Sequence, residues 1–385
     1  MRIIRFKSRS VSRADAVERL KMKIAFYSPL KSPNHPVPSG DRLMARLLIE
    51  ALTRAGHVVE IASELRTFSG DPEGRARAPI EAAAAAEIER LGAAWQAGGA
   101  PDVWFCYHPY YKAPDLIGPV LARRFGLAYV TAEASYSGRR NQGIWANDQT
   151  RLIEAVQGAA LNLCFTRRDR DGLAAAAPEG RYTLLQPFID PSAFLAGDPR
   201  PQRGRLAAVA MMRAGDKMES YRMLAAALAR LQHLPWSLSV VGDGPLREEV
   251  SALFAPLTPQ RIVWHSQRSG PEIADILRQS ALYVWPGTGE AYGLAYLEAQ
   301  AAGLPVVAQA VAGVPEVVRD GVTGLLTPAG DVAAYAAAVE RLLTDDAERA
   351  RMAVAARRFV IEDCSIDRAA RRLDEALQRH VGEGR

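Results

Sequence analysis

Two glutamates, Glu290 and Glu298, lie on either side of a glycine at the start of a predicted helix. If the helix begins at Leu294, the backbone N–H groups of Gly293 and Leu294 are free to hold an anion such as a phosphate. A carboxylate would repel that phosphate, so each glutamate would accept hydrogen bonds from hydroxyl groups beside it. Glu298 follows Gly293 by about 7 Å along the helix axis, which matches the offset between a diphosphate and a ribose, and Glu290 would meet a sugar. The alternative is a capping glutamate and a surface helical glutamate.

The segments around these residues alternate between short apolar runs and amphipathic stretches. Strands alternating with helices predict an α/β protein whose parallel sheets are covered by helices on both faces, with ligands outside the carboxyl ends of the strands. The predicted strands lie within residues 23–30, 57–63, 102–108, 127–135, 161–166, 205–212, 237–244, 261–266, 281–287, 305–311 and 323–330. The predicted helices cover residues 42–55, 113–126, 148–160, 220–231, 246–254, 272–279, 294–302 and the stretch from Asp331, as N-cap, to 343.

The length of 385 residues predicts two domains of this kind. A proline-rich stretch, 184–204, is typical of a linker. We predict a basic extension at 1–21, a first domain at 22–187, a linker at 188–204 and a second domain at 205–354. A C-terminal helix at 355–385 is predicted to cross back to the first domain.

Composition narrows the class of protein. Hydrophobic residues make up 49% and charged residues 24%, as in a globular protein, and no apolar run is long enough to span a membrane. Three cysteines far apart in sequence favour a reducing cytoplasm over a disulfide framework.

The formal net charge of +5 lies in residues 1–21, which hold seven basic and two acidic residues. We expect this extension to be disordered or to precede a true start at Met22, with peripheral attraction to anionic lipid at the inner face of the membrane as the alternative. A nucleic-acid partner is not expected, because no basic stripe with interleaved aromatic residues follows.

The stretch "PGTGEAYGLAYLEAQAAGLPVVAQAVAGVPEVVRDGVTGLLTPAGD" resembles the donor-site signature of the retaining glycosyltransferases with the GT-B fold, known as family 4 or group 1. The resemblance extends over about residues 22–375. It implies two Rossmann-like, doubly wound parallel-sheet domains that face a central cleft. It also implies transfer of a sugar, with retention of configuration, from a UDP-, GDP- or ADP-sugar to an acceptor hydroxyl, in bacterial polysaccharide, glycolipid or glycoconjugate synthesis.

The resemblance implies a basic clamp for the diphosphate after the first strand of the second domain. Arg213 and Lys217 stand there, and their charge would neutralise the leaving diphosphate; an ordinary solvated pair is the alternative. Gly242, in "VVGDG", fits a structural strand-to-helix turn better than a ligand contact. The remaining donor-side candidates are Tyr292, beside the helix start, and the base-binding stretch Ser266, Gln267 and Arg268.

In the first domain, relatives often carry two glycines before the first helix, whereas this chain has Ser39 and Gly40. Gly40 and Asp41 are candidates for contact with the donor phosphate, and a plain N-cap role for Ser39 or Asp41 is the alternative. Relatives commonly place a histidine where this chain has Glu133, so Glu133 and His108 are both catalytic candidates. The segment 133–145 is polar, aromatic and basic, as an acceptor loop would be.

No metal site or cofactor is predicted. The sequence "DRD" at 169–171 matches a metal-binding pattern of another glycosyltransferase fold, but its setting favours a capped helix start. The acceptor is left open among a sugar, a lipid-linked sugar and a small molecule. Two further functions stay open: a sugar-nucleotide epimerase of the same architecture, and a non-catalytic nucleotide-sugar binding protein.

Overall fold

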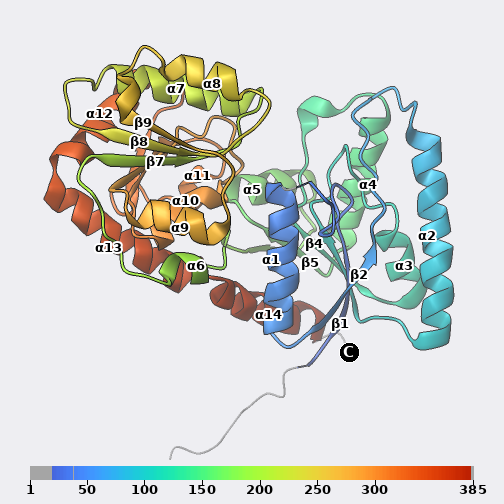
Figure 1. Cartoon of the computed structure of the whole chain (residues 1–385). Helices are drawn as coiled ribbons and strands as arrows, with labels where there is room; N and C mark the ends of the chain where they lie inside the picture. Colours follow the sequence, from blue (N-terminus) through green and yellow to red (C-terminus); the bar gives the residue numbers. More distant parts are fainter. Residues whose placement is uncertain (1–19, 38, 383–385) are drawn as a thin grey trace, which may run out of the picture.

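The structure is a computed structural model that describes residues 20–37 and 39–382. Nearly all of the predicted basic extension therefore lies outside the described residues. Two six-stranded sheets, each entirely parallel, form two α/β domains as predicted (Figure 1). Within the described chain, no helix combines the length and the apolar character needed to cross a bilayer.

The first sheet has the strand order β2-β1-β3-β4-β5-β6, and the second has the order β12-β11-β10-β7-β8-β9. The strands of the first sheet are β1 Lys23–Tyr27, β2 Val58–Ser63, β3 Val103–Tyr107, β4 Ala128–Ala132, β5 Leu161–Cys164 and β6 Tyr182–Leu184. Those of the second are β7 Arg205–Val209, β8 Ser237–Val241, β9 Ile262–His265, β10 Leu282–Val284, β11 Val306–Gln309 and β12 Gly324–Thr327.

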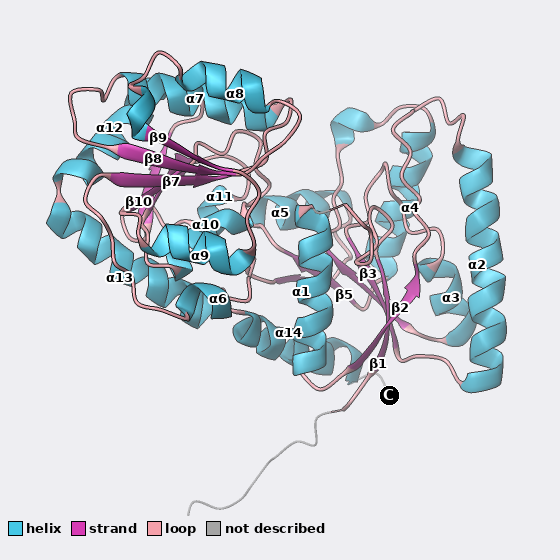
Figure 2. Cartoon of the chain, viewed as in Figure 1, coloured by secondary structure: helices cyan, strands magenta, loops and turns pink. Residues whose placement is uncertain are grey.

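Alternating side chains of the first sheet serve two helical layers. Ile24 and Phe26 pack in the core formed with α1 (Gly40–Arg54) and α14 (Ile366–Val381), whereas Ala25 and Tyr27 point to the opposite face. Figure 2 shows that second face covered by α2, α3 and α4. These helices span Arg77–Gly98, Gly118–Phe125 and Ile144–Gly158.

The remaining helices cover the second sheet and the two connections between the domains. Asp331 caps α12 by accepting from the Ala334 N–H at 2.8 Å, as predicted. The helices are α5 Arg167–Ala176, α6 Ser192–Leu195, α7 Asp216–Ala229, α8 Arg247–Phe254, α9 Gly270–Arg278, α10 Leu294–Ala301, α11 Val314–Val317, α12 Val332–Thr344 and α13 Asp346–Asp363. Short 3₁₀ turns occupy Gly138–Arg140 and Pro259–Arg261.

The predicted elements differ from the observed ones mainly at helix boundaries. The 22-residue helix α2 was not predicted, because its alanine-rich sequence lacks an apolar stripe at helical spacing. The helix predicted over 148–160 begins instead at Ile144, and the one predicted from Ser220 begins at Asp216. At the C-terminus the chain forms two helices, α13 and α14, that meet at Cys364 and Ser365.

The two connections between the sheets meet each other at one crossing. The N–H of Ile189, in the connection after β6, donates to the Cys364 carbonyl at 3.0 Å, and the Ile366 N–H donates back to Ile189 at 2.8 Å. Arg54 of α1 pairs with Asp190 at 2.9 Å and with Asp367 at 2.8 Å. Beyond the crossing, α14 packs against α1 of the first domain (Figure 1).

The strand orders place one topological switch point in each sheet. In the first sheet the chain changes direction between β1 and β3, and in the second between β7 and β10. Loops after these strands form crevices where ligands of open α/β sheets bind. His108 follows β3, and Lys217 and Glu290 lie after β7 and β10. The predicted site residues therefore belong to both switch points.

Leu377 tests the packing of α14 on the first domain, since its side chain is fully buried there. We expect Leu377→Ala to lower the free energy of unfolding by about 2–5 kcal/mol through lost contacts and a cavity. Urea unfolding followed by circular dichroism measures the change. Glu375→Ala, at an exposed position of the same helix, should change stability by less than about 0.5 kcal/mol; equal losses in both variants would contradict this packing.

Candidate active site

The loop between β10 and α10 is shaped by glycines around one tyrosine ring. Gly287 and Gly293 have φ values of 73° and 80°, and a Cβ at either position would lie 2.0 Å or 2.6 Å from an atom of the Tyr296 side chain. The loop is also held by the Thr288 N–H, which donates to the Ser220 hydroxyl at 2.9 Å. Only glycine fits this path. The backbone at the start of α10 therefore has a fixed position and is not covered by side chains of the loop itself.

Glu298 lies on α10 one turn beyond the helix start, with an uncommitted carboxylate. Within the described residues, no side chain or N–H group donates a hydrogen bond to it, and loss of water contact raises its pKa to about 7. The first N–H groups of a helix, here at Leu294 and next to it, have no intrahelical acceptor. A helix end with free N–H groups and a carboxylate without a donor therefore lie about one helical turn apart.

Glu290 is already engaged in the structure. Its carboxylate accepts a close hydrogen bond from the Lys217 ammonium group and another from Trp285 Nε1 at 3.2 Å. Lys217 also lies over the Trp285 ring, 5.6 Å from its centroid. Arg213 is exposed, and no partner for its guanidinium group is found in the described part of the chain. The predicted clamp thus consists of one cation held by Glu290 and one open to solvent.

The first domain contributes a charged cluster at the carboxyl ends of β3 and β4. His108 Nδ1 lies 3.2 Å from the Asp41 carboxylate, at the start of α1. Ser39, not Asp41, caps that helix by accepting from the Arg42 N–H at 3.2 Å. His108 and Glu133 have φ values of 59° and 57°, a left-handed conformation that is uncommon outside glycine.

The three ionisable groups of this cluster shift one another's pKa. Burial lowers the pKa of His108, but the Glu133 and Asp41 carboxylates outweigh burial and raise that pKa above its ordinary value. Burial raises the pKa of Glu133 despite the attraction of His108. Burial also acts to raise the pKa of Asp41, yet the hydrogen bond and charge of His108 leave it lowered. The cluster therefore favours a charged His108–Asp41 pair and a more readily protonated Glu133.

Tyr292 connects the two domains within the site. Its hydroxyl donates to the Glu133 carboxylate at 3.3 Å, and its ring packs edge-on against Phe165 with centroids 5.8 Å apart. The loop of the second domain and the cluster of the first therefore meet directly. We call this region of contact between the two domains the joint. The structure brings together the candidates Glu290, Lys217, Gly293, Leu294, Glu298 and Tyr292 on one side, and Asp41, His108 and Glu133 on the other.

Other candidates lie at the margin or serve packing. Ser266, Gln267 and Arg268 are exposed in the loop after β9, the edge strand, where Arg268 pairs with Glu272 at 3.0 Å. At Gly40 an added Cβ would meet nothing within 4 Å, so no close approach of protein atoms demands glycine there.

Gly242 lies so close to the neighbouring backbone that a side chain there would overlap it. Its φ is 140°, and a Cβ there would lie 1.9 Å from the Ala210 carbonyl oxygen. Ala210 and Met212 belong to the loop after β7, and the Met212 N–H donates to the Asp243 carbonyl at 2.9 Å. The close approach supports the structural interpretation of this glycine, because the turn after β8 holds the loop that carries Arg213.

The "DRD" segment forms the start of α5. Thr166 caps this helix by accepting from the Asp169 N–H at 3.0 Å, as predicted. Across the joint, Glu316 accepts from the Arg167 N–H at 3.0 Å and pairs with its guanidinium group at 3.3 Å. Over residues 20–37 and 39–382, no three His, Cys, Asp or Glu side chains cluster in a way that could hold a metal ion.

Several supporting residues escaped prediction. Ser220 and Gln309 are buried polar side chains that hold the glycine loop, Gln309 through Thr288 Oγ1 at 3.2 Å. Trp285 fixes Glu290, and Tyr107 lies against Glu133. The one sequence signal for Gln309 is a polar residue at the end of an otherwise apolar strand.

The chain resembles known proteins in sequence. Residues 203–345 match the family model for glycosyl transferases group 1. A D-inositol 3-phosphate glycosyltransferase of Frankia alni is 29% identical over 301 residues, which cover 68% of this chain and 71% of the relative. One of Catenulispora acidiphila is 31% identical over 276 residues, which cover 64% of this chain and 66% of the relative.

Solved structures share the two-domain fold. Sucrose-phosphate synthase from Thermosynechococcus elongatus has a TM-score of 0.72 at 19% identity, over 95% of this chain and all of the other. Anabaena Alr3699/HepE in complex with UDP has a TM-score of 0.67 at 16% identity, over 93% of this chain and all of the other. The two parallel-sheet domains have the GT-B fold of these glycosyltransferase structures. The chain belongs to the group 1 glycosyltransferases, which are enzymes that transfer sugars.

Gly242 offers a test of the architecture behind the site. We expect Gly242→Ala to lower the free energy of unfolding by about 2 kcal/mol or more, because the methyl group would overlap the Ala210 carbonyl. Chemical denaturation measures the loss. Gly270→Ala is the control, since a Cβ at Gly270 meets nothing within 4 Å. Unchanged stability of Gly242→Ala, with lost nucleotide binding, would instead assign this glycine to the ligand.

Proposed function

We propose that this enzyme transfers a sugar from a nucleotide-diphosphate sugar to an acceptor hydroxyl with retention of anomeric configuration. The observation that carries the proposal is the uncommitted Glu298 carboxylate beside the free N-terminus of α10. Diphosphate at the helix end and ribose at Glu298 would satisfy both groups at once. The UDP complex of Anabaena HepE is a neighbour in fold, so UDP is the first nucleotide to test.

The second domain would stabilise the leaving diphosphate without a metal ion. Arg213 and Lys217 would join the N–H groups of Gly293 and Leu294, each placed where negative charge builds up in the transition state. Lys217 now bonds Glu290, so a bound diphosphate would compete for this ammonium group. Glu290 would then be free to accept hydrogen bonds from the sugar, and Lys217 would bridge sugar and phosphate.

The first domain would supply the acceptor side. In an oxocarbenium-like transition state, the acceptor hydroxyl would enter near the departing phosphate, which can take its proton. The sugar and the acceptor would be oriented by Asp41, His108 and Glu133. The hydrogen bond from Tyr292 to Glu133 would hold the two domains together in the closed arrangement. Closure of the domains would exclude water and limit hydrolysis.

An anionic polyol is the acceptor class we propose to test first. Two relatives are named D-inositol 3-phosphate glycosyltransferase, and the predicted acceptor loop carries exposed Arg139 and Arg140. Near it, Lys112 lies over the Trp145 ring at 5.0 Å. Synthesis of polysaccharide, glycolipid or glycoconjugate in the cytoplasm, including at the membrane surface, would use such chemistry.

Thermal unfolding in the presence of UDP, GDP or ADP, with EDTA, tests the donor site. At 100 times its dissociation constant, the matching nucleotide should stabilise the protein by about 2.7 kcal/mol. Glu298→Ala should lose most of this stabilisation, because the ribose loses its acceptor. Glu249→Ala, at an exposed position in α8 of the same domain, should retain it. No stabilisation of the wild type by any of the three nucleotides would overturn the proposal.

Product analysis then distinguishes the proposed reaction from its alternatives. A new glycoside with retained configuration supports transfer, an isomerised donor identifies an epimerase, and binding without any product identifies a binding protein. Membership of the group 1 glycosyltransferases favours the first outcome.

The raised pKa of Glu298 predicts a pH-dependent affinity for the donor. Ribose hydroxyls donate to the ionised carboxylate, so binding lowers the pKa from about 7 and releases a proton. Affinity for the sugar nucleotide should therefore rise as the pH is raised from 6 toward about 7 and level off above the pKa of the free protein. Calorimetry at several pH values measures the slope, and Glu298→Gln should show none of it. The same slope in both proteins would assign the titration to another group.

A further inference from the structure

A cavity lies in the first domain, away from the contact between the two domains. It has a volume of about 790 Å³, is partly open to solvent and is lined by α2, α3, α4 and the start of β4. Leu127, Ala160 and Arg181 in its lining each precede a strand, so the cavity lies toward the amino ends of β4, β5 and β6. The candidate active site uses the carboxyl ends of the strands. The two sites are therefore on opposite edges of the same sheet.

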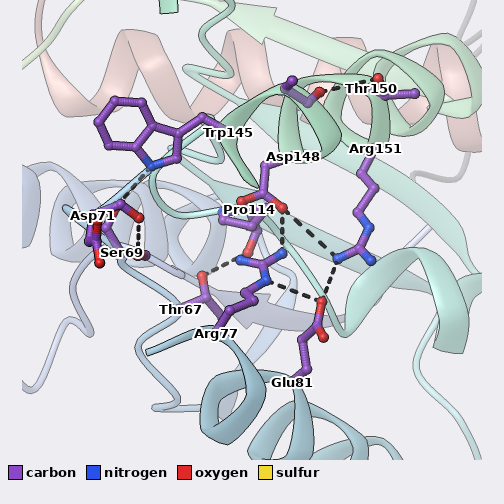
Figure 3. Close-up of polar contacts among 11 residues, drawn as sticks. Thr67, Ser69, Asp71, Arg77, Glu81, Pro114, Trp145, Asp148, Thr150 and Arg151 are labelled. Carbon is purple, nitrogen blue, oxygen red and sulfur yellow. Dashed lines mark hydrogen bonds and ion pairs between the residues drawn. The ribbon is translucent and has the colours of Figure 1, made fainter. Parts of the chain in front are cut away.

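The cavity exists because α2 is held at its two ends and carries small side chains between them. Near its start, Arg77 bonds the buried Asp148 of α4, and Arg151 bonds Glu81 at 3.1 Å (Figure 3). Near its end, Trp95 packs edge-on against Phe125, with centroids 5.5 Å apart. The buried Ala84 and the exposed Ala85 line the cavity from the middle of α2, and their small side chains leave the space unfilled.

The lining is apolar inside and charged at the mouth. Ala84, Ile88, Val120, Leu127 and Ala155 supply the apolar wall. Asp115, a partly buried carboxylate in the lining, already has hydrogen-bond partners. It accepts hydrogen bonds from Trp104 Nε1, the Tyr129 hydroxyl and the N–H groups of Ile117 and Gly118, at 2.8, 3.1, 3.0 and 2.7 Å.

Charge at the mouth favours an anion. Arg123 and Arg181 are exposed in the lining, and neither guanidinium group has a hydrogen-bond or ion-pair partner within the described chain. Glu154 also lines the cavity and has no ion-pair partner among residues 20–37 and 39–382, whereas Arg151 pairs with Glu81. Two free cations therefore face one free carboxylate, and an incoming anionic head would gain charge-assisted hydrogen bonds.

We propose that this cavity binds a single-chain amphiphile, with its aliphatic chain along α2 and its anionic head group at Arg123 and Arg181. Ligand sites are typically cavities of about 300–1,000 Å³ with apolar walls and a few polar groups that fix orientation, and this cavity fits that description. Occupancy would also complete the packing of α2 on the sheet. The site does not depend on the donor chemistry proposed above.

Calorimetric titration with dodecyl phosphate, kept below its micellar concentration, tests the apolar part. We expect saturable one-to-one binding to the wild type. Ala85→Trp should weaken it by about tenfold or more, because Ala85 lines the cavity from an exposed position and the indole would fill the space. Ala86→Trp is the matched control, since this neighbour is exposed outside the lining and should bind as the wild type does.

The head-group part is tested with probes of the same chain and different charge. Dodecylammonium should bind about tenfold more weakly than dodecyl phosphate, and inorganic phosphate alone should not bind. Replacing Arg123 and Arg181 together by alanine should abolish the preference for the anion, whereas Arg230→Ala, an exposed position of the second domain, should leave it intact. These variants remove only exposed side chains, so they keep the test valid even if Ala85→Trp fails to fold.

Three results would overturn the proposal. The first is absence of dodecyl phosphate binding up to its micellar concentration. The second is equal binding of the anionic and cationic probes, or of inorganic phosphate without the chain. The third is undiminished binding to a folded Ala85→Trp variant, which would place the amphiphile elsewhere on the surface.

Discussion

The joint between the two sheets depends on one crossing of the chain. The connection after β6 and the turn between α13 and α14 bond each other through Ile189, at 3.0 Å and 2.8 Å. Arg54 ties both segments to α1 through Asp190 and Asp367. Every covalent path between the domains passes here. Any change in the spacing of the two switch points must therefore be absorbed at this crossing, and hinge motions typically use a few such residues.

The site on the joint divides charge between the domains. The second domain offers positive charge from Arg213, Lys217 and the end of α10, where a leaving phosphate would need it. The first domain contributes Asp41, His108 and Glu133, whose charges shift one another's pKa. Within the second domain, Lys217 bonds Glu290. This pair avoids leaving a partly buried carboxylate and ammonium group unpaired, which would be costly.

Sequence was most informative where local chemistry decides structure. Glycines that must adopt positive φ, such as Gly293, mark the loop before α10, and apolar runs mark the buried parallel strands. Helix α2 was missed because alanines give no periodic signal, and its position depends on ion pairs such as Arg77 with Asp148. The Asp41–His108 contact joins residues 67 positions apart. Such contacts follow from strand order, which the pattern of one chain does not specify.

Glu133 and His108 show how the fold maintains an unfavourable local geometry for the site. Each sits in a left-handed conformation that costs about 1–3 kcal/mol outside glycine. The hydrogen bonds between neighbouring strands continue through both residues. The His108 N–H donates to the Ala132 carbonyl at 2.8 Å, and the Glu133 N–H donates to the Leu163 carbonyl at 2.8 Å. The backbone therefore turns without losing its hydrogen bonds.

Each of these turns is next to a contact that reaches another element. His108 meets Asp41 of α1, and Glu133 meets Tyr292 of the second domain. Relaxing the φ of His108 would move its ring away from the Asp41 carboxylate, and relaxing that of Glu133 would move its carboxylate away from the Tyr292 hydroxyl. The strained backbone and these contacts therefore depend on each other, and both lie at the carboxyl edge of the first sheet, where Glu133 meets the second domain.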